Sequence, residues 1–308
     1  MHWQGKAALA HVFSMLPMGN DLHYFAQRRI TRSLPSPDEK FVEIFNQAKE
    51  HVEVLNHHGA TSLETARFYE FGAGWELGIP LSFHALGARL QVVVDIRRLL
   101  RIELVNEILR KLQRMHCEVS EGQSLERFLD TNHSGQWIDQ LAEYYGIQYL
   151  APCDARNTGL EGGSIDFVTS TNTLEHIPAK DIRLIFKECR RLLKRGGLMS
   201  CIIDYQDHYS YSDRRISVYN FLKYSDSAWR WYNPAFHYQN RLRHNDYLRL
   251  FREEGFEVVE ERCTQPSEND LEILRGASIW EPFRKSYDFA ELGIRTAHVV
   301  VRAGSRTA

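Results

Sequence analysis

Phe68-Tyr69-Glu70-Phe71-Gly72-Ala73-Gly74-Trp75-Glu76-Leu77-Gly78 is the stretch that decides the fold. Together with Ala66, its first residues have the pattern of a strand, and its glycines lead into a helix expected over residues 79–86. Gly72 and Gly74 allow the backbone to approach a ligand at the amino end of that helix, because neither carries a Cβ. A turn that merely needs positive φ has the same composition, so the glycines alone do not establish a ligand site.

The same alternation of strand and helix patterns continues along the chain. The expected strands are residues 66–71, 91–95, 148–154, 165–171, 198–203, 256–260 and 297–301. The expected helices after the first are residues 102–112, 180–195 and 246–254, with Gly196-Gly197 and Gly255 ending the last two. Strands joined by helical crossovers form a parallel sheet with helices on both faces. The sequence therefore predicts an α/β protein with a doubly wound, mostly parallel, seven-stranded sheet.

Two segments fall outside this alternation. Residues 1–63 are expected to form an N-terminal helical cap, which is interrupted at Leu34-Pro35-Ser36-Pro37. Residues 206–245 form a long, aromatic-rich insertion, and a structureless loop of that length is unusual. We expect this insertion to contain helices and to act as an acceptor lid, while residues 64–205 and 246–308 form the core.

The composition excludes several classes of protein. The 38 Lys and Arg residues nearly balance the 40 Asp and Glu residues, so the chain of 308 residues has no overall basic character and no nucleic-acid partner is expected. No apolar run approaches the roughly 18 residues that a spanning helix needs, and the first residues lack the apolar core of a secretory signal. We therefore expect no integral membrane segment and a cytoplasmic location.

The cysteines do not indicate a metal or disulfide framework. The five residues are Cys117, Cys153, Cys189, Cys201 and Cys263. Their number is odd, and no two of them form a Cys-x-x-Cys pair. Cys189 and Cys201 fall in patterns typical of a buried helix and a buried strand, where cysteine behaves as a small apolar residue.

Carboxylates follow the second and third expected strands. Asp95 lies 21 residues beyond Gly74, the spacing at which a carboxylate accepts hydrogen bonds from the hydroxyls of a ribose. Asp154, followed by Ala155, lies where a carboxylate can accept a bond from an adenine amino group, although an exposed surface Asp is also possible there. This arrangement indicates a nucleoside-containing cofactor.

The fourth strand continues into Asn172-Thr173-Leu174-Glu175-His176-Ile177-Pro178, and Leu192-Leu193-Lys194-Arg195-Gly196-Gly197-Leu198 precedes the fifth. Together with the glycine turn and the two acids, these segments resemble the class I methyltransferases that use S-adenosylmethionine. The resemblance covers about residues 66–204 well and residues 246–303 in outline. It implies a Rossmann-like methyltransferase fold, with S-adenosyl-L-methionine as the cofactor.

Residue by residue, the resemblance implies a cofactor site. Its members are Glu70, Gly72, Ala73, Gly74, Asp95, Asp154, Ala155 and Asn172. Glu70 and the glycine turn would shape the methionine pocket, Asp95 would hold the ribose and Asp154 the adenine, with Asn172 near the methionine end. One departure stands out, because Glu76 occupies a position where many members have a third glycine. Two alternatives stay open: an NAD(P)-dependent oxidoreductase with a similar sheet, and a catalytically inactive cofactor-binding subunit.

Methyl transfer to a hydroxyl needs a base near the end of the fifth strand. His208 follows that strand, and histidine as a residue type can take up a proton near neutral pH. Asp204 or Asp207 could orient its ring. His237 and His176 are the other candidates for the base. The acids of this segment together with His208 could also ligate Mg²⁺, but loop acids at this spacing are usually solvated, so no metal is predicted.

The insertion alternates aromatic and polar residues, a composition that suits a sugar ring or a polar aromatic metabolite. A satellite core beneath a lid would explain the same aromatics. Residues 217–225 also resemble a subgroup of bacterial methyltransferases associated with polysaccharide synthesis. The function expected from the sequence is methyl transfer from S-adenosylmethionine to a hydroxyl or another heteroatom of a saccharide or small-molecule acceptor.

Overall fold

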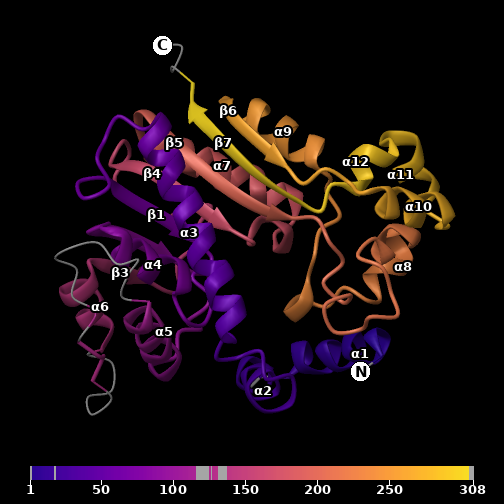
Figure 1. Ribbon diagram of the computed structural model, residues 1–308, viewed down its shortest axis with the longest axis horizontal. Helices are drawn as coiled ribbons and strands as arrows, with labels where there is room; N and C mark the ends of the chain where they lie inside the picture. Colours follow the sequence, from indigo (N-terminus) through magenta and orange to yellow (C-terminus); the bar gives the residue numbers. More distant parts are fainter. Residues whose placement is uncertain (1, 17–18, 116–124, 126, 131–136, 305–308) are drawn as a thin grey trace.

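A computed structural model describes residues 2–16, 19–115, 125, 127–130 and 137–304, so Cys117 lies outside the described residues. Within them, seven strands form one sheet in the order β3-β2-β1-β4-β5-β7-β6 (Figure 1). The strands are β1 (Arg67–Phe71), β2 (Leu90–Val94), β3 (Ile147–Leu150), β4 (Ile165–Thr171), β5 (Leu193–Asp204), β6 (Phe256–Cys263) and β7 (Thr296–Ala303). Strands β1 to β5 pair in parallel, whereas β7 runs antiparallel to both β5 and β6. The expected doubly wound, mostly parallel, seven-stranded sheet is confirmed.

Helices cover both faces of this sheet (Figure 1). One face packs against α7 (Ala179–Leu192) and α9 (His244–Glu253). The other face packs against α3 (Asp38–His58), α4 (Gly78–Leu86), α5 (Ile102–Arg114) and α6 (Trp137–Tyr145). Neighbouring residues of β1 alternate between the two layers, with Phe68 on one face and Tyr69 on the other. The strands are therefore buried on both sides, which explains their nearly continuous apolar sequence.

Several boundaries differ from the sequence prediction, and two of these differences have a local physical reason. Helix α7 ends at Leu192, and the chain enters β5 at Leu193, so Gly196-Gly197 does not end the helix. Gly196 instead has a φ of +78° in a stretch where the pairing of β4 with β5 shifts register. Strand β3 ends at Leu150, before Pro152, which has no amide hydrogen to donate to a neighbouring strand.

A side lobe stands beside the sheet. It comprises residues 207–243, with a 3-10 turn (Asn220–Lys223), α8 (Asp226–Arg230) and a second 3-10 turn (Ala235–His237), and the helices α10 (Glu268–Gly276), α11 (Glu281–Ser286) and α12 (Phe289–Gly293). The sequence reading missed the last three helices, which lie between β6 and β7. Buried aromatic residues of the insertion, including Tyr219, Phe221 and Trp229, share one apolar cluster with Leu274 and Phe283 of these helices.

The N-terminal segment reaches from the side lobe to the sheet (Figure 1). Helix α1 (Trp3–Met15) contributes Trp3 and Ala7 to the apolar cluster of the lobe. Helix α2 (Gly19–Phe25) continues into a π-helical turn (Ala26–Ile30), and α3 then packs on the sheet. None of the helices in the described ranges is long and apolar enough to cross a membrane.

Candidate active site

The glycine turn lies at the carboxyl end of β1, beside β4, where the order of the strands reverses. This position is the usual ligand crevice of a doubly wound sheet. Gly72 and Gly74 have φ values of +87° and +65°, a conformation that favours glycine. A Cβ at Gly72 would lie 2.5 Å from Cγ2 of Thr173, whereas a Cβ at Gly74 would meet no atom within 4 Å. Gly72 is therefore needed for packing, and Gly74 borders open space that can admit a ligand.

Asp95, which follows β2, is hydrogen-bonded to this turn. Its Oδ2 accepts the Gly74 amide at 3.1 Å, and its Oδ1 accepts the Arg97 amide at 2.8 Å. The amides of Gly72 and Ala73 both donate to the carbonyl of Val94 at the end of β2. Burial raises the pKa of Asp95, although the two amides oppose this shift. The turn and the ribose-binding candidate thus form one hydrogen-bonded unit.

Glu70 is buried at the end of β1, where its carboxyl group accepts a hydrogen bond from Thr169 Oγ1 at 3.0 Å. Burial raises the pKa of Glu70 to about 8, while the Thr169 hydroxyl acts in the opposite direction. The side chain is therefore mostly protonated at neutral pH in the absence of a ligand. A bound cation beside it would favour the carboxylate.

Glu76, the residue that replaces a third glycine, has a structural partner. Its carboxylate accepts the amide of Ser36 at 3.2 Å and also the Ser36 hydroxyl. The buried Nζ of Lys111 donates to the carbonyl of Ser36 and pairs with Asp38 at 2.6 Å. Glu76 therefore holds the proline-containing segment before α3 against the glycine turn. This contact accounts for a Glu at a position where many family members have a third glycine.

The remaining cofactor candidates lie at the ends of β3 and β4. Asp154 is partly exposed and forms an ion pair with Arg156 at 2.7 Å, which lowers the pKa of Asp154. Ala155 is partly buried against the core. Asn172 has a φ of +49°, and its Nδ2 lies 3.5 Å from Gln47 Oε1 of α3. The contact between Thr173 and Gly72 places the Asn172 loop next to the glycine turn.

Helix α2 covers the turn from outside, which the sequence reading did not anticipate. The ring of Tyr24 stacks on Trp75 with centroids 5.3 Å apart, and His23 lies 6.4 Å from Trp75. Asp21 pairs with Arg101 at 2.5 Å. Trp75 therefore packs against the N-terminal segment at the edge of the cofactor crevice.

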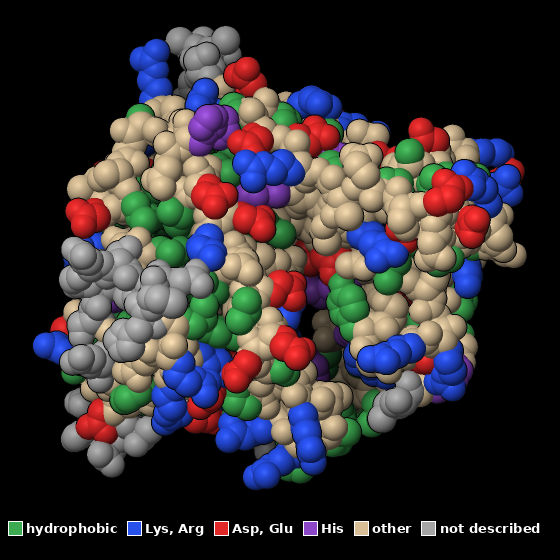
Figure 2. Space-filling view, in the orientation of Figure 1, with side chains coloured by type: hydrophobic (Ala, Val, Ile, Leu, Met, Phe, Trp, Pro, Cys, Tyr) green, Lys and Arg blue, Asp and Glu red, His purple; other side chains and the backbone are tan. Residues whose placement is uncertain are grey.

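Three histidines gather beyond the ends of β4 and β5. His176 and His208 have ring centroids 4.9 Å apart, and His237 lies 6.5 Å from His208. All three candidates for the base thus belong to one cluster, although they come from three separate segments of the chain. Figure 2 shows a hollow between the sheet and the side lobe, with histidine side chains inside it.

His208 lies beside two partners. Its Nε2 is 3.2 Å from Oδ2 of Asp204, the last residue of β5. The ring of Tyr211 stacks on His208 at 5.2 Å, and its hydroxyl donates to Asp204. The interaction with His208 lowers the pKa of Asp204 despite burial, which favours the carboxylate. Asp204 can therefore orient the imidazole and stabilise its protonated form.

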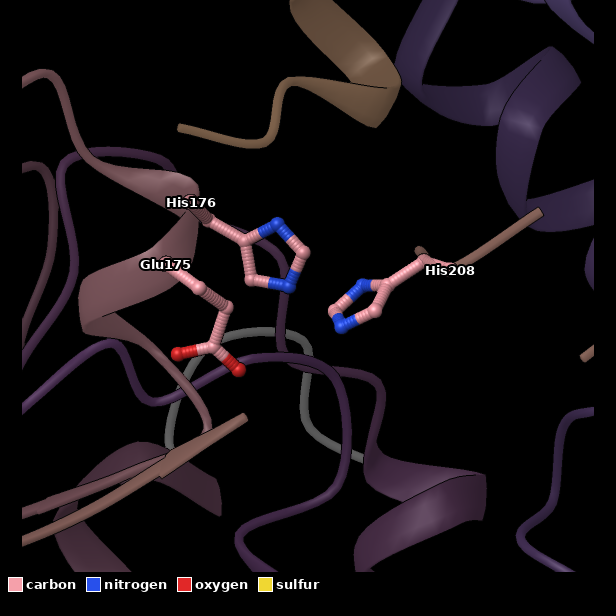
Figure 3. Close-up of side chains that lie close together, drawn as sticks. All are labelled: Glu175, His176 and His208. Carbon is pink, nitrogen blue, oxygen red and sulfur yellow. The ribbon is translucent and has the colours of Figure 1, made fainter. Parts of the chain in front are cut away.

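Glu175 and His176 lie on a 3-10 turn directly after β4, facing His208 (Figure 3). Nδ1 of His176 lies 2.8 Å from the carbonyl of Tyr238, to which it donates. The ring of His176 is open to solvent on one side, but desolvation by the surrounding protein still lowers its pKa to about 4. Glu175 is buried, which raises its pKa well above the ordinary value. Among the described atoms, neither carboxyl oxygen of Glu175 has a hydrogen-bond partner. The sequence reading quoted Glu175 within a motif but gave it no role.

The returning limb of the insertion fixes these loops in place. The amide of Asn240 donates to the carbonyl of Glu175 at 2.7 Å, and its Nδ2 donates to Leu174 and Ile177. Oε1 of Gln239 accepts the His208 amide at 3.2 Å. The positions of the histidines therefore depend on residues 233–243, which also carry His237.

His237, the third histidine of the cluster, is partly buried. Its centroid lies 4.3 Å from that of Tyr209, and its Nε2 has no hydrogen-bond partner among the described atoms. Burial, followed by the nearby Lys6 and His208, lowers the pKa of His237 to about 2. The imidazole is neutral at physiological pH, so it offers a lone pair to a donor from a bound molecule.

One comparison with known proteins, the match to a family model, agrees with this geometry. A family model described as a methyltransferase domain matches residues 120–201. No curated protein sequence matches the chain.

Solved structures with similar folds have low sequence identity. Geranyl diphosphate C-methyltransferase from Streptomyces coelicolor A3(2) is 12% identical, with 88% of this chain and 86% of that chain covered and a TM-score of 0.45. A geranyl diphosphate methyltransferase bound to S-adenosylmethionine is 10% identical, with coverages of 88% and 93% and a TM-score of 0.48. The YcgJ protein from Bacillus subtilis is 12% identical, with coverages of 83% and 98% and a TM-score of 0.43.

Proposed function

We propose that this chain is a class I S-adenosylmethionine-dependent methyltransferase that methylates a hydroxyl or another heteroatom of a saccharide or small metabolite. The methyltransferase-domain match bears out the family resemblance, and the oxidoreductase alternative is not favoured. The observation that carries the acceptor class is the cluster of His176, His208 and His237. The rings of Tyr209 and Tyr211 pack against this cluster, and histidine side chains lie in the hollow of Figure 2.

The cofactor would be held by the residues at the strand ends. These are Glu70, Gly72, Ala73, Gly74, Asp95, Asp154, Ala155 and Asn172. The open space at Gly74 and the buried carboxyl groups of Glu70 and Asp95 fit a ligand with a cationic centre and ribose hydroxyls. When bound, S-adenosylmethionine supplies a methyl group on a positively charged sulfur.

His208 is the proposed base. Its ring would accept the proton of the acceptor, and Asp204 at 3.2 Å would stabilise the resulting imidazolium. His176, held by the Tyr238 carbonyl, and the neutral His237 would line the acceptor pocket and orient the acceptor. The helical cap of residues 1–63 and the lid of residues 206–245 would enclose the acceptor and exclude water.

The cofactor assignment is tested by calorimetry with S-adenosylhomocysteine. We expect one site per chain. Incubation with S-adenosylmethionine and a panel of saccharides and hydroxylated metabolites should then give a product heavier by one methyl group, measured by mass spectrometry. Binding without methylation of any acceptor would instead support the inactive-subunit alternative.

The base assignment is tested by His208→Ala and His208→Gln. A general base typically contributes about 10² to 10⁴-fold, so turnover should fall by that factor while affinity for S-adenosylhomocysteine stays within about threefold. His57→Ala is the matched control, because His57 lies at the end of α3, away from the histidine cluster. Nearly normal turnover in both His208 variants would reject the assignment.

A further inference from the structure

Glu175, His176 and His208 are arranged like the ligands of a metal ion. Each offers one atom, and these three atoms all lie within 4.8 Å of one another. The side chains converge from the turn after β4 and from the segment after β5 (Figure 3). Ligands at about 2.0–2.2 Å from one tetrahedral ion lie roughly 3.3–3.6 Å apart, so the three atoms would have to move closer together to contact one ion at once.

The buried carboxyl group of Glu175 is the first sign of a ligand. Neither oxygen has a hydrogen-bond partner among the described atoms, although the side chain is almost fully buried. Leaving a buried polar group unpaired is costly, so most such groups in native proteins have a partner. A cation bound between Glu175 and the histidines would supply one.

His176 provides an independent sign. Its Nδ1–H donates to the backbone carbonyl of Tyr238, which leaves the lone pair of Nε2 directed elsewhere. Histidines that bind metals usually donate their other ring N–H to a carbonyl or carboxylate in this way. The tautomer and orientation needed for a metal ligand are therefore fixed by the fold.

We propose that Glu175, His176 and His208 bind a divalent first-row transition metal ion, such as Zn²⁺, Fe²⁺ or Co²⁺. Two imidazoles and one carboxylate suit these ions, whereas Mg²⁺ and Ca²⁺ prefer oxygen ligands alone. Three protein ligands leave a coordination position open for a further molecule.

This site differs from the acidic Mg²⁺ cluster considered from the sequence. Asp207 accepts the side-chain amide of Asn220 at 3.0 Å, and Asp213 caps α1 by accepting the Trp3 amide at 3.0 Å. Both acids therefore have structural partners in the side lobe. Of that group, His208 belongs to the proposed site, and Asp204 lies next to it.

The role of the ion in activating the acceptor rests on the proposed function, whereas the binding of the ion to the protein does not depend on it. In the metal-bound form the His208 lone pair is on the ion, so the acceptor oxygen would occupy the open position instead of bonding to His208. A metal-bound oxygen loses its proton at lower pH, and that proton would pass to solvent. The oxygen then forms a bond to the methyl carbon while the carbon–sulfur bond breaks, and the electron pair of that bond remains on sulfur.

A second group provides a matched control. His244, Glu261 and Cys263 also lie within 4.8 Å of one another. However, His244 is bonded at both ring nitrogens, with Nε2 2.9 Å from Glu261 and Nδ1 3.0 Å from the Tyr205 hydroxyl. The ring nitrogens of this group already have hydrogen-bond partners. Its thiol would give a charge-transfer band if it bound a Co²⁺ ion.

Cobalt is the probe for the test. The full chain, freed of metal with a chelator, is titrated with Co²⁺ while its visible d–d absorption is recorded. We expect one ion per chain, no thiolate-to-cobalt charge-transfer band, and displacement by Zn²⁺. Glu175→Gln and His176→Gln should each weaken Co²⁺ binding by at least about tenfold, whereas Cys263→Ser should leave it unchanged. Circular dichroism and thermal melting show that each variant is folded.

The outcomes separate this proposal from the proposed function. Absence of Co²⁺ binding, or binding lost in Cys263→Ser and retained in Glu175→Gln, overturns the metal site even if methyl transfer is found. Co²⁺ binding that depends on Glu175 and His176 supports the site even if no acceptor is methylated. If methylation is found, restoring the metal should shift the pH profile of turnover to lower pH, and an unchanged profile would overturn the role in activation.

Discussion

Gly74 and Gly196 have similar backbone conformations, with φ values of +65° and +78°, and a Cβ at either would meet no atom within 4 Å. Alanine at either position should therefore lower stability only through the strain of the left-handed conformation, by about 1 to 2 kcal/mol. Gly74 borders the proposed cofactor crevice, whereas Gly196 lies near the start of β5, at the other edge of the sheet. Gly74→Ala should weaken S-adenosylhomocysteine binding, and Gly196→Ala should not. Thermal melting and calorimetry measure the two effects, and equal affinities would contradict the role of the turn.

Asp95→Ala should weaken S-adenosylhomocysteine binding by about 1.5 to 3 kcal/mol, the scale of hydrogen bonds to a charged group. Part of this loss would come from the turn, because Asp95 accepts the Gly74 amide. Asp166→Ala is the control, since Asp166 also accepts a backbone amide, that of Arg67, but at the amino end of β1. Calorimetry on both variants should show a loss only for Asp95→Ala, and unchanged affinity would reject the ribose assignment.

Glu70 predicts a pH dependence of stability. Its pKa is raised to about 8 by burial, so between its ordinary value near 4.5 and pH 8 the folded chain retains a proton that the unfolded chain has released. The contribution of Glu70 to stability is therefore present at low pH and is lost as the pH rises through this window. Glu70→Gln removes the titration and should gain about 1 to 3 kcal/mol relative to the unsubstituted chain between pH 5 and pH 8. Urea unfolding at both values measures this, and a parallel pH dependence of the two proteins would contradict it.

At the residue scale, local patterns were sufficient to predict where the glycine turn and Asp95 lie in the fold. The two glycines and Asp95 could be predicted because they follow consecutive strands, whose ends meet at one edge of the sheet. The place of Glu175 could not be predicted, because the turn that carries it is held by Asn240 and Tyr238, more than sixty residues away. The three histidines were predicted separately, and only the folded chain shows that they form one cluster.

At the scale of elements, the sequence predicted the existence of strands and helices better than their ends. The apolar period of α7 continues through Leu193, so the pattern favoured a longer helix, but pairing of Leu193 with Ile165 begins β5 there. The helices α10 to α12 were missed because each has at most nine residues, too few for a clear helical period. Their apolar residues face the insertion, and this long-range packing has no local signature.

The two tryptophans of the insertion should respond differently to substitution. Trp229 is 4% exposed within the cluster of the side lobe, whereas Trp231 is 78% exposed. Trp229→Ala should cost about 3 to 5 kcal/mol of stability. Trp231→Ala should change it by about 0.5 kcal/mol or less. Thermal or urea unfolding measures both. Similar losses for the two variants would contradict the division between a packed lobe core and an exposed rim.

At the scale of the whole molecule, the N-terminal helices contact both the side lobe and the glycine turn, which the sequence prediction treated as separate parts. Helix α1 packs on the side lobe, while α2 packs on the glycine turn through the contact of Tyr24 with Trp75. The N-terminal segment therefore runs between the side lobe and the sheet (Figure 1). The sequence predicted a helical cap, but it could not predict these contacts, because the partners of α1 lie about two hundred residues away.

Trp3→Ala tests this connection. Trp3 is buried against Tyr209, Tyr224 and Tyr232 of the lobe, with its nearest ring, that of Tyr232, at 4.7 Å. Loss of this side chain should loosen α1 from the lobe, so the acceptor would be enclosed less tightly and its KM should rise. Helix α2 keeps its own ion pair between Asp21 and Arg101, so affinity for S-adenosylhomocysteine should stay within about threefold, less than 1 kcal/mol.

The control for this substitution is Leu9→Ala on the same helix, because Leu9 is exposed and lies outside the lobe cluster. Hydrogen exchange of α1 should accelerate in Trp3→Ala and remain unchanged in Leu9→Ala. If exchange in α1 accelerates while the KM of the acceptor stays the same, α1 does not help to enclose the acceptor. If affinity for S-adenosylhomocysteine falls together with acceptor affinity, the two N-terminal helices act as one unit, and the separate anchoring of α2 is wrong.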